Sequence, residues 1–568
     1  MRAPRCPSHV GASLAFAALL PLTSAMAPAF AEDRVSPGRP LDGSAPAAPY
    51  AQPPPWRAPR GGPVERGELA PVMTQDASGL PLELWQGLDL AALEGLLAGL
   101  ELPPRSLALH TLWRRLLKAA ATPPQGVPNA EHFTALRLEA LYRSGLLADM
   151  GELLDADGRP DAVVDALAAR REIGLGRQQA GCERVKALAM PRAGLPGRLK
   201  GEIALLSGYC AAAAGDAAGA GLAVDLAREE GFDAALPLSV LAGFAAAMKP
   251  RLALPSRVLL LDYRFLELLG PVDGQGLIDR GEPALLVALA AEQRADPQLA
   301  AAATEAAVRV HALPVAALAD AYRRLAAAEG SGGGSAPASR RAALFRALEL
   351  ARTPAERARQ VRALVEEGRR SALSDPLARL IAPELGALHE LGESADLAET
   401  ATEIALTAGD FASAREWARA LPTWRDLVDV VAPQDGRPAP RLAAIAELAA
   451  RGRIGPEALQ RLVTVLDALN CDVPIALWDA ASNAPQPATG FLPDTGTLAE
   501  LAAAAKRREV GRTVLLVMRA LGPQGPQGTH VLALSDGVRA LQRVGLAADA
   551  RRLALEALLA VWPRAGDN

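Results

Sequence analysis

One triplet in this chain has the sequence of a known catalytic motif. Asp494-Thr495-Gly496 is the pattern in which an aspartate shares a proton with a second aspartate and activates water. That chemistry needs a β-rich fold and a second carboxylate. Because Pro493 precedes the triplet and an alanine-rich helical pattern begins at Leu498, we predict a loop in which Asp494 or Thr495 caps a helix.

Metal ligands are suggested in two places, and neither pattern is complete. The Asp-Ala-Asp-Gly sequence at 155–158 begins like a calcium loop, but the later oxygen ligands and the closing glutamate are missing, so we predict a turn. His389 is followed by Glu390 but lacks the second histidine of a zinc-binding pair. We therefore predict no metal and no cofactor. The other histidines after residue 31 are His110, His132, His311 and His530, far apart in the sequence.

Composition and charge disfavour two classes of partner. Half of the 568-residue chain is apolar, 50%, and its formal net charge is −4 at pH 7. Such a balance lacks the basic excess that neutralises nucleic-acid phosphates or anionic lipid headgroups. Aromatic residues make up 4% of the chain, which suits helices packed through Ala and Leu better than a β-sandwich core. We expect no nucleic acid among its partners.

The first 31 residues have the pattern of a secretory signal peptide. Arg2 and Arg5 form a basic start, and residues 10–22 form an apolar run too short to span a bilayer. A small-x-small cleavage site follows at 29–31, and cleavage there changes the net charge from −4 to −6 because it removes two arginines and no acidic residue. The alternative, a retained anchor, is disfavoured because Pro21 interrupts the run. We predict a periplasmic or secreted protein without a transmembrane anchor.

Beyond this signal, composition divides the chain into four parts. Residues 32–80 are rich in Pro, Gly, Ser and Ala and cannot bury enough apolar surface to order themselves, so we predict a disordered leader. From residue 81 onwards, Leu and Ala recur at helical spacing, with Pro, Gly and Asp between the helices. A Gly- and Ser-rich stretch at 330–339 predicts a flexible linker between two helical halves, 81–329 and 340–568.

The predicted fold class is all-α. Short β-branched runs at 258–261 and 514–517 sit in helix-length segments, and we interpret them as buried helix faces. Helices joined by short turns over most of the chain predict either bundles or an α-solenoid. The leading helical segments that we expect are 82–100, 105–121, 129–144, 161–171 and 276–293.

Three cysteines remain after signal cleavage: Cys182, Cys210 and Cys471. Residues 172–190 and 198–214 both have helical patterns, and prolines and glycines between them mark a turn. Since the midpoint of the first two cysteines falls at that turn, an antiparallel hairpin brings them to the same height on facing helices. We predict a disulfide between Cys182 and Cys210, with two buried thiols as the alternative. Cys471 is then a free thiol.

The clearest helical hairpin lies at 394–422. Its first helix ends at Gly409, where a left-handed conformation is easiest, and Asp410 caps the second helix. The small side chains of Ala414 and Ala418 let the two helices approach closely. The second helix carries Phe411, Ala414, Trp417, Ala418 and Leu421 on one side. The hairpin resembles a tetratricopeptide repeat, whose second helix commonly opens with a Gly-Asp-aromatic turn and carries alanines at these positions.

This resemblance recurs less closely at two other places. Gly215-Asp216 and Gly545 repeat some of the offsets, but the spacing among the three places fits no single repeat length. The resemblance therefore implies an irregular, tetratricopeptide-like α-solenoid of antiparallel helix hairpins and no active site. The whole mature chain is also similar to a loose group of alanine- and arginine-rich secreted proteins of alphaproteobacteria, and that similarity implies no active site either.

These patterns predict a non-enzymatic scaffold that binds a protein or peptide partner in the cell envelope, because helical hairpins follow one another without a catalytic motif. Trp417, Trp424 and Trp478 are candidate partner contacts, since tryptophan supplies a large contact area, with core packing as the alternative for each. A second hypothesis is an enzyme acting on a cell-wall or glycan substrate, with carboxylates brought together from separate helices. Two carboxylates facing each other across a deep pocket would favour the enzyme, and an open groove the scaffold.

Overall fold

The computed structural model describes residues 72–564 with short gaps. The gaps are 77, 127–129, 158–160, 189–196, 249, 251, 293–295, 331–333, 392–394, 435–440 and 486–488. The predicted signal peptide and the predicted leader up to residue 71 lie outside the described residues. The last part of that leader packs onto the folded chain, because the Arg115 Nε donates to the Ser78 carbonyl at 2.8 Å and the Leu80 side chain is buried. Residues 70–568 form one compact unit.

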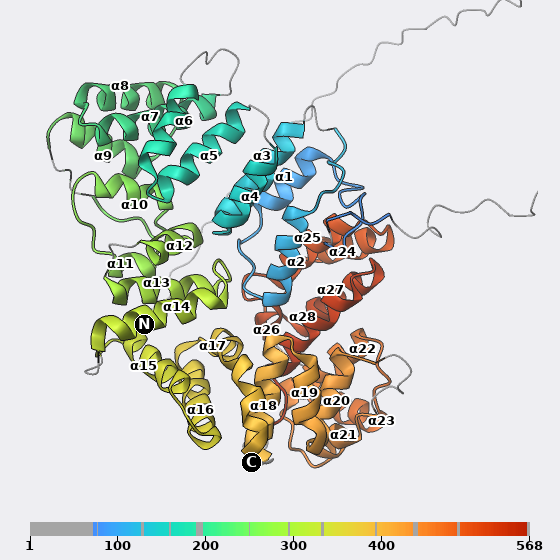
Figure 1. The fold of residues 1–568 in the computed structure, drawn as a ribbon. Coiled ribbons are helices and arrows are strands. Elements are labelled where there is room, and N and C mark those ends of the chain that lie inside the picture. The colour runs from blue at the N-terminus through green and yellow to red at the C-terminus, as the bar shows by residue number, and fades with distance from the viewer. Residues whose placement is uncertain are drawn as a thin grey trace, which may run out of the picture. The chain divides into compact units, whose positions relative to one another are not determined.

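Every regular element in the described part of this unit is a helix, so the all-α prediction is confirmed. Extended pairing is limited there to isolated bridges. The first fourteen helices, shown in Figure 1, are α1 Leu90–Ala98, α2 Leu107–Lys118, α3 Ala130–Arg143, α4 Leu147–Asp157, α5 Ala162–Gly174, α6 Gln178–Leu188, α7 Gly197–Ala213, α8 Ala217–Glu229, α9 Ala235–Ala245, α10 Leu260–Glu267, α11 Gln275–Ile278, α12 Pro283–Ala291, α13 Pro297–Arg309 and α14 Val315–Glu329.

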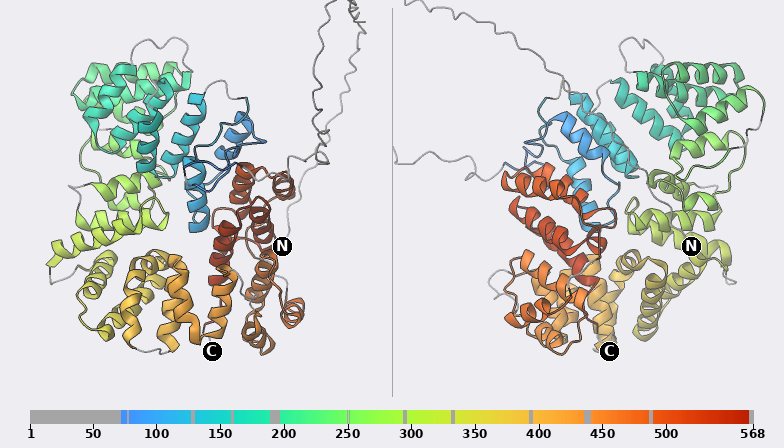
Figure 2. Two further views of the ribbon diagram at one scale, coloured as in Figure 1. Left: turned by 45° about the vertical axis from the view of Figure 1, so that its right-hand side comes forward. Right: turned by 180° about the vertical axis from the view of Figure 1, so that it is seen from behind.

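The remaining helices continue the same succession of short elements. They are α15 Pro337–Glu349, α16 Pro354–Ser371, α17 Ser374–Ile381, α18 Ala395–Ala408, α19 Phe411–Trp417, α20 Pro422–Val431, α21 Ala443–Ala450, α22 Pro456–Ala468, α23 Ile475–Ser482, α24 Thr495–Lys506, α25 Val510–Leu521, α26 Gly525–Gly528, α27 Val531–Arg543 and α28 Ala547–Leu559. Two 3-10 segments, η3 Ala382–Leu391 and η4 Ala418–Ala420, follow α17 and α19. Most helices pack against the next one along the chain, as the two views of Figure 2 also show.

Glycines in the left-handed region end several of these helices. The backbone φ is +81° at Gly215, +76° at Gly409 and +86° at Gly545. In this region a side chain would be strained, and glycine lets the chain reverse directly into the next helix. The three places where the sequence predicted the same turn therefore share its backbone conformation.

Two expected helices are shorter than their hydrophobic patterns suggested. The segment predicted at 82–100 begins with turns, because Gly87 has a φ of +79°, and α1 starts only after Asp89 caps it. The segment predicted at 276–293 is divided, because Pro283 opens the new helix α12. The run at 258–261 is also only partly helical, since the Val258 backbone pairs with the extended chain before α12.

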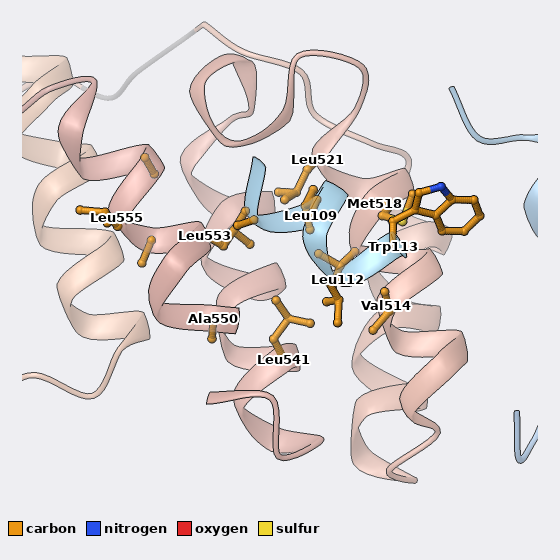
Figure 3. Packing of buried hydrophobic residues seen from close by; sticks show 14 of the residues in the cluster. Leu109, Leu112, Trp113, Val514, Met518, Leu521, Leu541, Ala550, Leu553 and Leu555 are labelled. Atoms are coloured by element: carbon orange, nitrogen blue, oxygen red, sulfur yellow. The ribbon is translucent and has the colours of Figure 1, made fainter. Parts of the chain in front are cut away.

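The run at 514–517 lies in α25, and all four side chains are buried, as predicted. Helix α25 is one of the last helices of the chain, and it packs against one of the first, α2. Helix α2 also packs against α28, as Figure 3 shows. In that view Leu109, Leu112 and Trp113 of α2 lie among Val514, Met518, Leu521, Leu541, Ala550, Leu553 and Leu555. We call this contact the closing junction.

Polar groups also hold the closing junction together. Arg115 of α2 pairs with Asp549 of α28 at 2.7 Å, and the Gly511 amide at the start of α25 donates to the Leu84 carbonyl at 2.9 Å. In an open array of hairpins each element contacts only its neighbours along the chain. Here the described helices also join the start of the unit to its end. The α-solenoid assignment itself stays a prediction.

The Gly- and Ser-rich stretch at 330–339 connects α14 to α15, which begins within it at Pro337. The helices on either side are tied by a buried ion pair, because Arg341 of α15 donates two hydrogen bonds of 2.7 Å to Glu305 of α13. Tyr322 of α14 donates to the same carboxylate at 2.8 Å. Helices α13, α14 and α15 therefore pack as a group across this stretch.

Candidate functional site

The cysteine pair predicted from the symmetry of a hairpin is joined in the structure. Cys182 lies on α6 and Cys210 on α7, and the two form a disulfide with their Cα atoms 5.7 Å apart. The turn between these helices falls mostly on residues that are not described. Cys471 is a half-buried free thiol, and burial raises its pKa to about 11, so it stays protonated and unreactive near neutral pH.

The predicted hairpin at 394–422 is present as α18 and α19. Gly409 ends α18, and the Asp410 side chain accepts a hydrogen bond from the Ser413 amide at 3.1 Å at the start of α19. Ala414 and Ala418 are fully buried, as their small size suggested, while Phe411 is partly buried. The second helix is shorter than expected, since it becomes the 3-10 segment η4 after residue 417. Its identity as a tetratricopeptide-like repeat stays a prediction.

The three tryptophans proposed as partner contacts occupy three different environments. Trp417 is 1% exposed and stacks on His389, with ring centroids 4.2 Å apart, so it is a core residue. Trp424 is 2% exposed, and its Nε1 donates to the Glu399 carboxylate at 3.1 Å. Trp478 on α23 is 44% exposed. The structure therefore leaves one of the three on the surface.

Trp424 also lines a pocket of about 490 Å³, which we call the tryptophan pocket. Its walls come from α18, the start of α20, the end of α21, the start of α22 and the chain that follows α28. They are formed by Glu399, Leu421, Thr423, Trp424, Leu448, Arg453, Ile454, Gly455, Ala458, Ala560, Val561, Trp562, Pro563 and Arg564. Distant parts of the sequence thus converge on one concave surface.

The polar groups of the tryptophan pocket are mostly donors. Glu399 is the only carboxylate among the lining residues, and it accepts the hydrogen bond from Trp424. Trp562 is 1% exposed, and its Nε1 is buried without a hydrogen-bond partner among the described residues. Arg453 is exposed, and its guanidinium pairs with no described carboxylate. The pocket therefore presents an exposed arginine and apolar walls, and its lining includes no pair of facing carboxylates.

A second group of titratable side chains lies at the closing junction. The Ala108 amide, in the first turn of α2, donates to the Glu556 carboxylate of α28 at 2.5 Å. Burial raises the pKa of Glu556 to about 7, and the hydrogen bonds from the start of α2 oppose this rise. A carboxylate from the far end of the chain thus helps to cap α2, where unpaired amides and the helix dipole favour an acceptor.

Two stacked histidines lie beside this cap. The His110 and His311 ring centroids are 5.2 Å apart, and His311 Nε2 donates to the Arg105 carbonyl at 2.9 Å. Burial lowers the pKa of His110 to about 3 and the pKa of His311 to about 4. Both rings are therefore neutral near pH 7. Because Glu556 is engaged by backbone donors and the histidines are packed together, this group serves as a structural joint.

The motifs first inspected for chemistry have structural roles. Asp494 caps α24, since its side chain accepts from the Thr497 amide at 2.8 Å, and Asp161 caps α5 in the same way. Within the described segments no cluster of His, Cys, Asp and Glu is arranged to hold a metal ion. None of the helices described between residues 72 and 564 combines the length and the apolar character needed to cross a bilayer.

Sequence reasoning missed Arg453 and Trp562, which complete the tryptophan pocket. Neither residue belongs to a motif, and Trp562 lies more than a hundred residues from Trp424, so no local pattern connects them. A search for glycines and prolines that open helices without a capping side chain could have drawn attention to the start of α22, beside Arg453. No family model, curated protein or solved structure matches this chain.

Proposed function

We propose that this protein is an exported, non-enzymatic helical scaffold that binds a protein or peptide partner in the cell envelope. The observation that carries the proposal is an apolar face on α23. Ile475 is 86% exposed and Trp478, three residues later on the same side of the helix, is 44% exposed. Leu477 and Ala481 hold the opposite side of α23 in the core. Exposed tryptophan next to exposed isoleucine is typical of a surface that another protein covers.

Other exposed apolar side chains lie in the same part of the sequence. Phe491 and Leu492 precede α24, and Leu532 lies in the first turn of α27. The backbone of Phe491 lies beside the start of α27, because the His530 amide donates to the Phe491 carbonyl at 3.0 Å. The region from α23 to α27 therefore contains candidate contact residues in addition to the predicted Trp478.

Export is part of this proposal, and the disulfide supports it. A bond between Cys182 and Cys210 persists in an oxidising compartment such as the periplasm, and it is rare in reducing cytosol. This agrees with the signal-peptide pattern at residues 1–31. Together the two observations support a periplasmic or secreted location.

Site-specific photo-crosslinking tests the proposal. We would replace Trp478 by a photoreactive phenylalanine analogue in cells that express the full chain, irradiate them, and identify adducts by mass spectrometry. We expect one reproducible envelope protein from this position. The control places the same analogue at Leu222 on α8, which is 61% exposed and far from α23 in the sequence. Loss of a reproducible adduct at 478, or the same adducts at both positions, would contradict the proposed function.

A further inference from the structure

We infer that the exposed face of α23 binds a basic amphipathic segment of a partner protein, in which Lys or Arg side chains flank an apolar cluster. This inference rests on the proposed function, because it names the chemistry of the partner that covers the same face. Three observations carry it: the apolar pair on α23, the carboxylates beside that pair, and the absence of basic residues from this part of the sequence.

Helix α23 presents its apolar pair on an ordered support. Ile475 and Trp478 are 86% and 44% exposed, whereas Leu477 on the opposite side is fully buried. Helices α21 and α22 both pack against α23 (Figure 1), and the Gln460 side chain of α22 donates a hydrogen bond to the Ala481 carbonyl. A partner therefore meets a surface that is already in place, so binding loses little conformational entropy on this side.

Two carboxylates flank this apolar pair. Asp479 lies four residues after Ile475, on the same side of the helix, and Asp472 lies in the short segment before the helix. Both residues are exposed, and neither forms an ion pair with a described cation. Asp472 does not cap the helix either, because α23 follows Pro474 without a side-chain hydrogen bond at its start. These two charges are therefore available to a partner.

The sequence around α23 supplies no cation to offset these charges. Residues 471–505 contain no Lys, Arg or His, and their acidic residues besides Asp472 and Asp479 are Asp494 and Glu500. Asp494 caps α24, and Glu500 pairs with Arg512 at 4.0 Å. The acids with a structural role are thus on α24, and those without one are beside the apolar pair.

The helices that pack against α23 do not neutralise its face either. Helices α21 and α22 together carry a single basic residue, Arg461. Its guanidinium is buried and donates to the Pro526 and Thr529 carbonyls at 2.6 and 3.1 Å. The exposed face of α23 is therefore negative as well as apolar.

This combination selects one kind of occupant. Carboxylates repel nucleic-acid phosphates and anionic lipid headgroups, and two copies of this face brought together would oppose their own carboxylates. A basic segment instead gains ion pairs at the edge of a contact whose centre is apolar, which is the usual anatomy of a protein interface. An amphipathic helix offers this pattern, with apolar side chains three and four residues apart and Lys or Arg beside them.

Peptide binding tests the inference. Three labelled peptide pools of about twelve residues share leucines at helical spacing and carry mainly Lys, Gln or Glu at the polar positions. In fluorescence anisotropy at low salt, the purified mature chain should bind the Lys pool at least about tenfold more tightly than the Gln pool, and the Glu pool most weakly. Trp478→Ala should weaken Lys-pool binding by about 30-fold or more, because an aromatic anchor at the centre of the contact is lost.

Charge variants separate this face from the rest of the acidic surface. D479N, alone and together with D472N, should weaken Lys-pool binding by about 2- to 5-fold for each charge removed and leave Gln-pool binding unchanged. The dependence of affinity on salt should also become less steep. The matched control is D225N on α8, an exposed carboxylate that lies three residues after the exposed Leu222. It should bind like the unchanged chain.

Several results would overturn the inference. These are equal binding of the Lys and Gln pools, no binding of the Lys pool, and the same loss from D225N as from D479N. Binding to phosphatidylglycerol vesicles that is lost in Trp478→Ala would assign the face to a membrane and overturn the inference too. Dimerisation of the chain that is lost in the same variant would assign the face to a second copy, with the same consequence.

These outcomes are separable from failure of the proposed function. A reproducible envelope protein crosslinked at residue 478 through an acidic or neutral segment, with a yield unaffected by D472N and D479N, would leave the scaffold proposal intact and remove only the basic partner. Absence of any reproducible adduct at residue 478 would remove the proposed function, whatever the peptides show.

Discussion

The tryptophan pocket and the closing junction both involve the C-terminal end of the folded unit, and they differ in how their charged groups are paired. At the junction, the Glu556 carboxylate accepts a hydrogen bond from the Ala108 amide at 2.5 Å, and Arg115 forms an ion pair with Asp549 at 2.7 Å. In the pocket, Trp562 Nε1 has no described acceptor and Arg453 has no described counter-ion.

This difference separates a joint held by ion pairs and hydrogen bonds from a pocket whose Arg453 faces solvent. Buried polar groups in folded proteins are nearly always paired, because an unpaired one loses its hydration without compensation. At the junction Arg115 and Glu556 obey this rule through partners from both ends of the unit, whereas His110 Nε2 and His311 Nδ1 are buried without a described partner. In the pocket Trp562 Nε1 departs from the rule in the same way.

The largest effect expected at neutral pH breaks the junction. Leu112 of α2 is fully buried against the C-terminal helices, as Figure 3 shows, so Leu112→Ala should lower the free energy of unfolding by roughly 3–4 kcal/mol. Chemical denaturation of the mature chain measures it. Leu222→Ala, at an exposed position of α8, is the control and should cost less than about 1 kcal/mol. A comparable loss from both variants would show that the junction is no more important than a surface helix.

The next effect is a dependence on acidic pH at the junction. His110 and His311 titrate near pH 3 and 4 in the folded chain but near 6.5 when unfolded, so the unfolded chain binds more protons between these values. Stability should therefore fall as pH drops from 6.5 to 4, by about 1.4 kcal/mol per pH unit for each histidine. His311→Asn removes one of the two titrating histidines. Asparagine tolerates the positive φ of 61° at this position. An unchanged pH slope in this variant would contradict the assignment.

Glu556 should act with the opposite sign. Its pKa is about 7 in the folded chain and 4.5 in the reference state, so the folded chain binds the extra proton between these values. Stability from this group is present at low pH and is lost as pH rises from 4.5 to 7, by up to about 1.4 kcal/mol per pH unit. Glu556→Gln keeps an acceptor for the Ala108 amide and removes the titration. The difference in unfolding free energy between this variant and the unchanged chain should therefore not be the same at pH 5 as at pH 7.

The smallest effect concerns the pocket. Arg453→Gln should change the free energy of unfolding by less than about 0.5 kcal/mol, because Arg453 is exposed and stabilises no described partner. Trp562→Phe keeps most of the buried ring and removes an unpaired donor, so its cost should be below about 1.5 kcal/mol. Thermal unfolding measures both. A large loss from Arg453→Gln would mean that the arginine is part of the fold and would erase the contrast with the junction.

Several features were predictable because they depend on residues close together in the sequence. The Gly409-Asp410 turn, the cap at Asp494 and the disulfide between Cys182 and Cys210 each involve a stretch of about 30 residues or fewer. Such features follow from local conformational preference and from the symmetry of a hairpin. The same locality explains the overextended prediction at 82–100, where a hydrophobic pattern concealed the left-handed turn at Gly87.

The environments of the tryptophans were not predictable in this way. Trp417, Trp424 and Trp478 lie within a short part of the sequence, yet one is in the core, one lines a pocket and one is exposed. The difference depends on which helices cover each side chain. Trp424 shares its pocket with Trp562, and sequence periodicity does not indicate that these two residues line one pocket.

By itself, the sequence determined that residues after the leader form short capped helices, where those helices reverse, and which two cysteines meet, because these outcomes depend on hydrogen bonds and packing within a hairpin. Only the tertiary structure decided that α2 joins α28 and that Arg453, Trp424 and Trp562 share one pocket. The Ala108 and Glu556 partners are 448 residues apart. Contacts of that range form because burial of the remaining apolar faces favours one arrangement of the whole unit, and no local pattern records which faces meet.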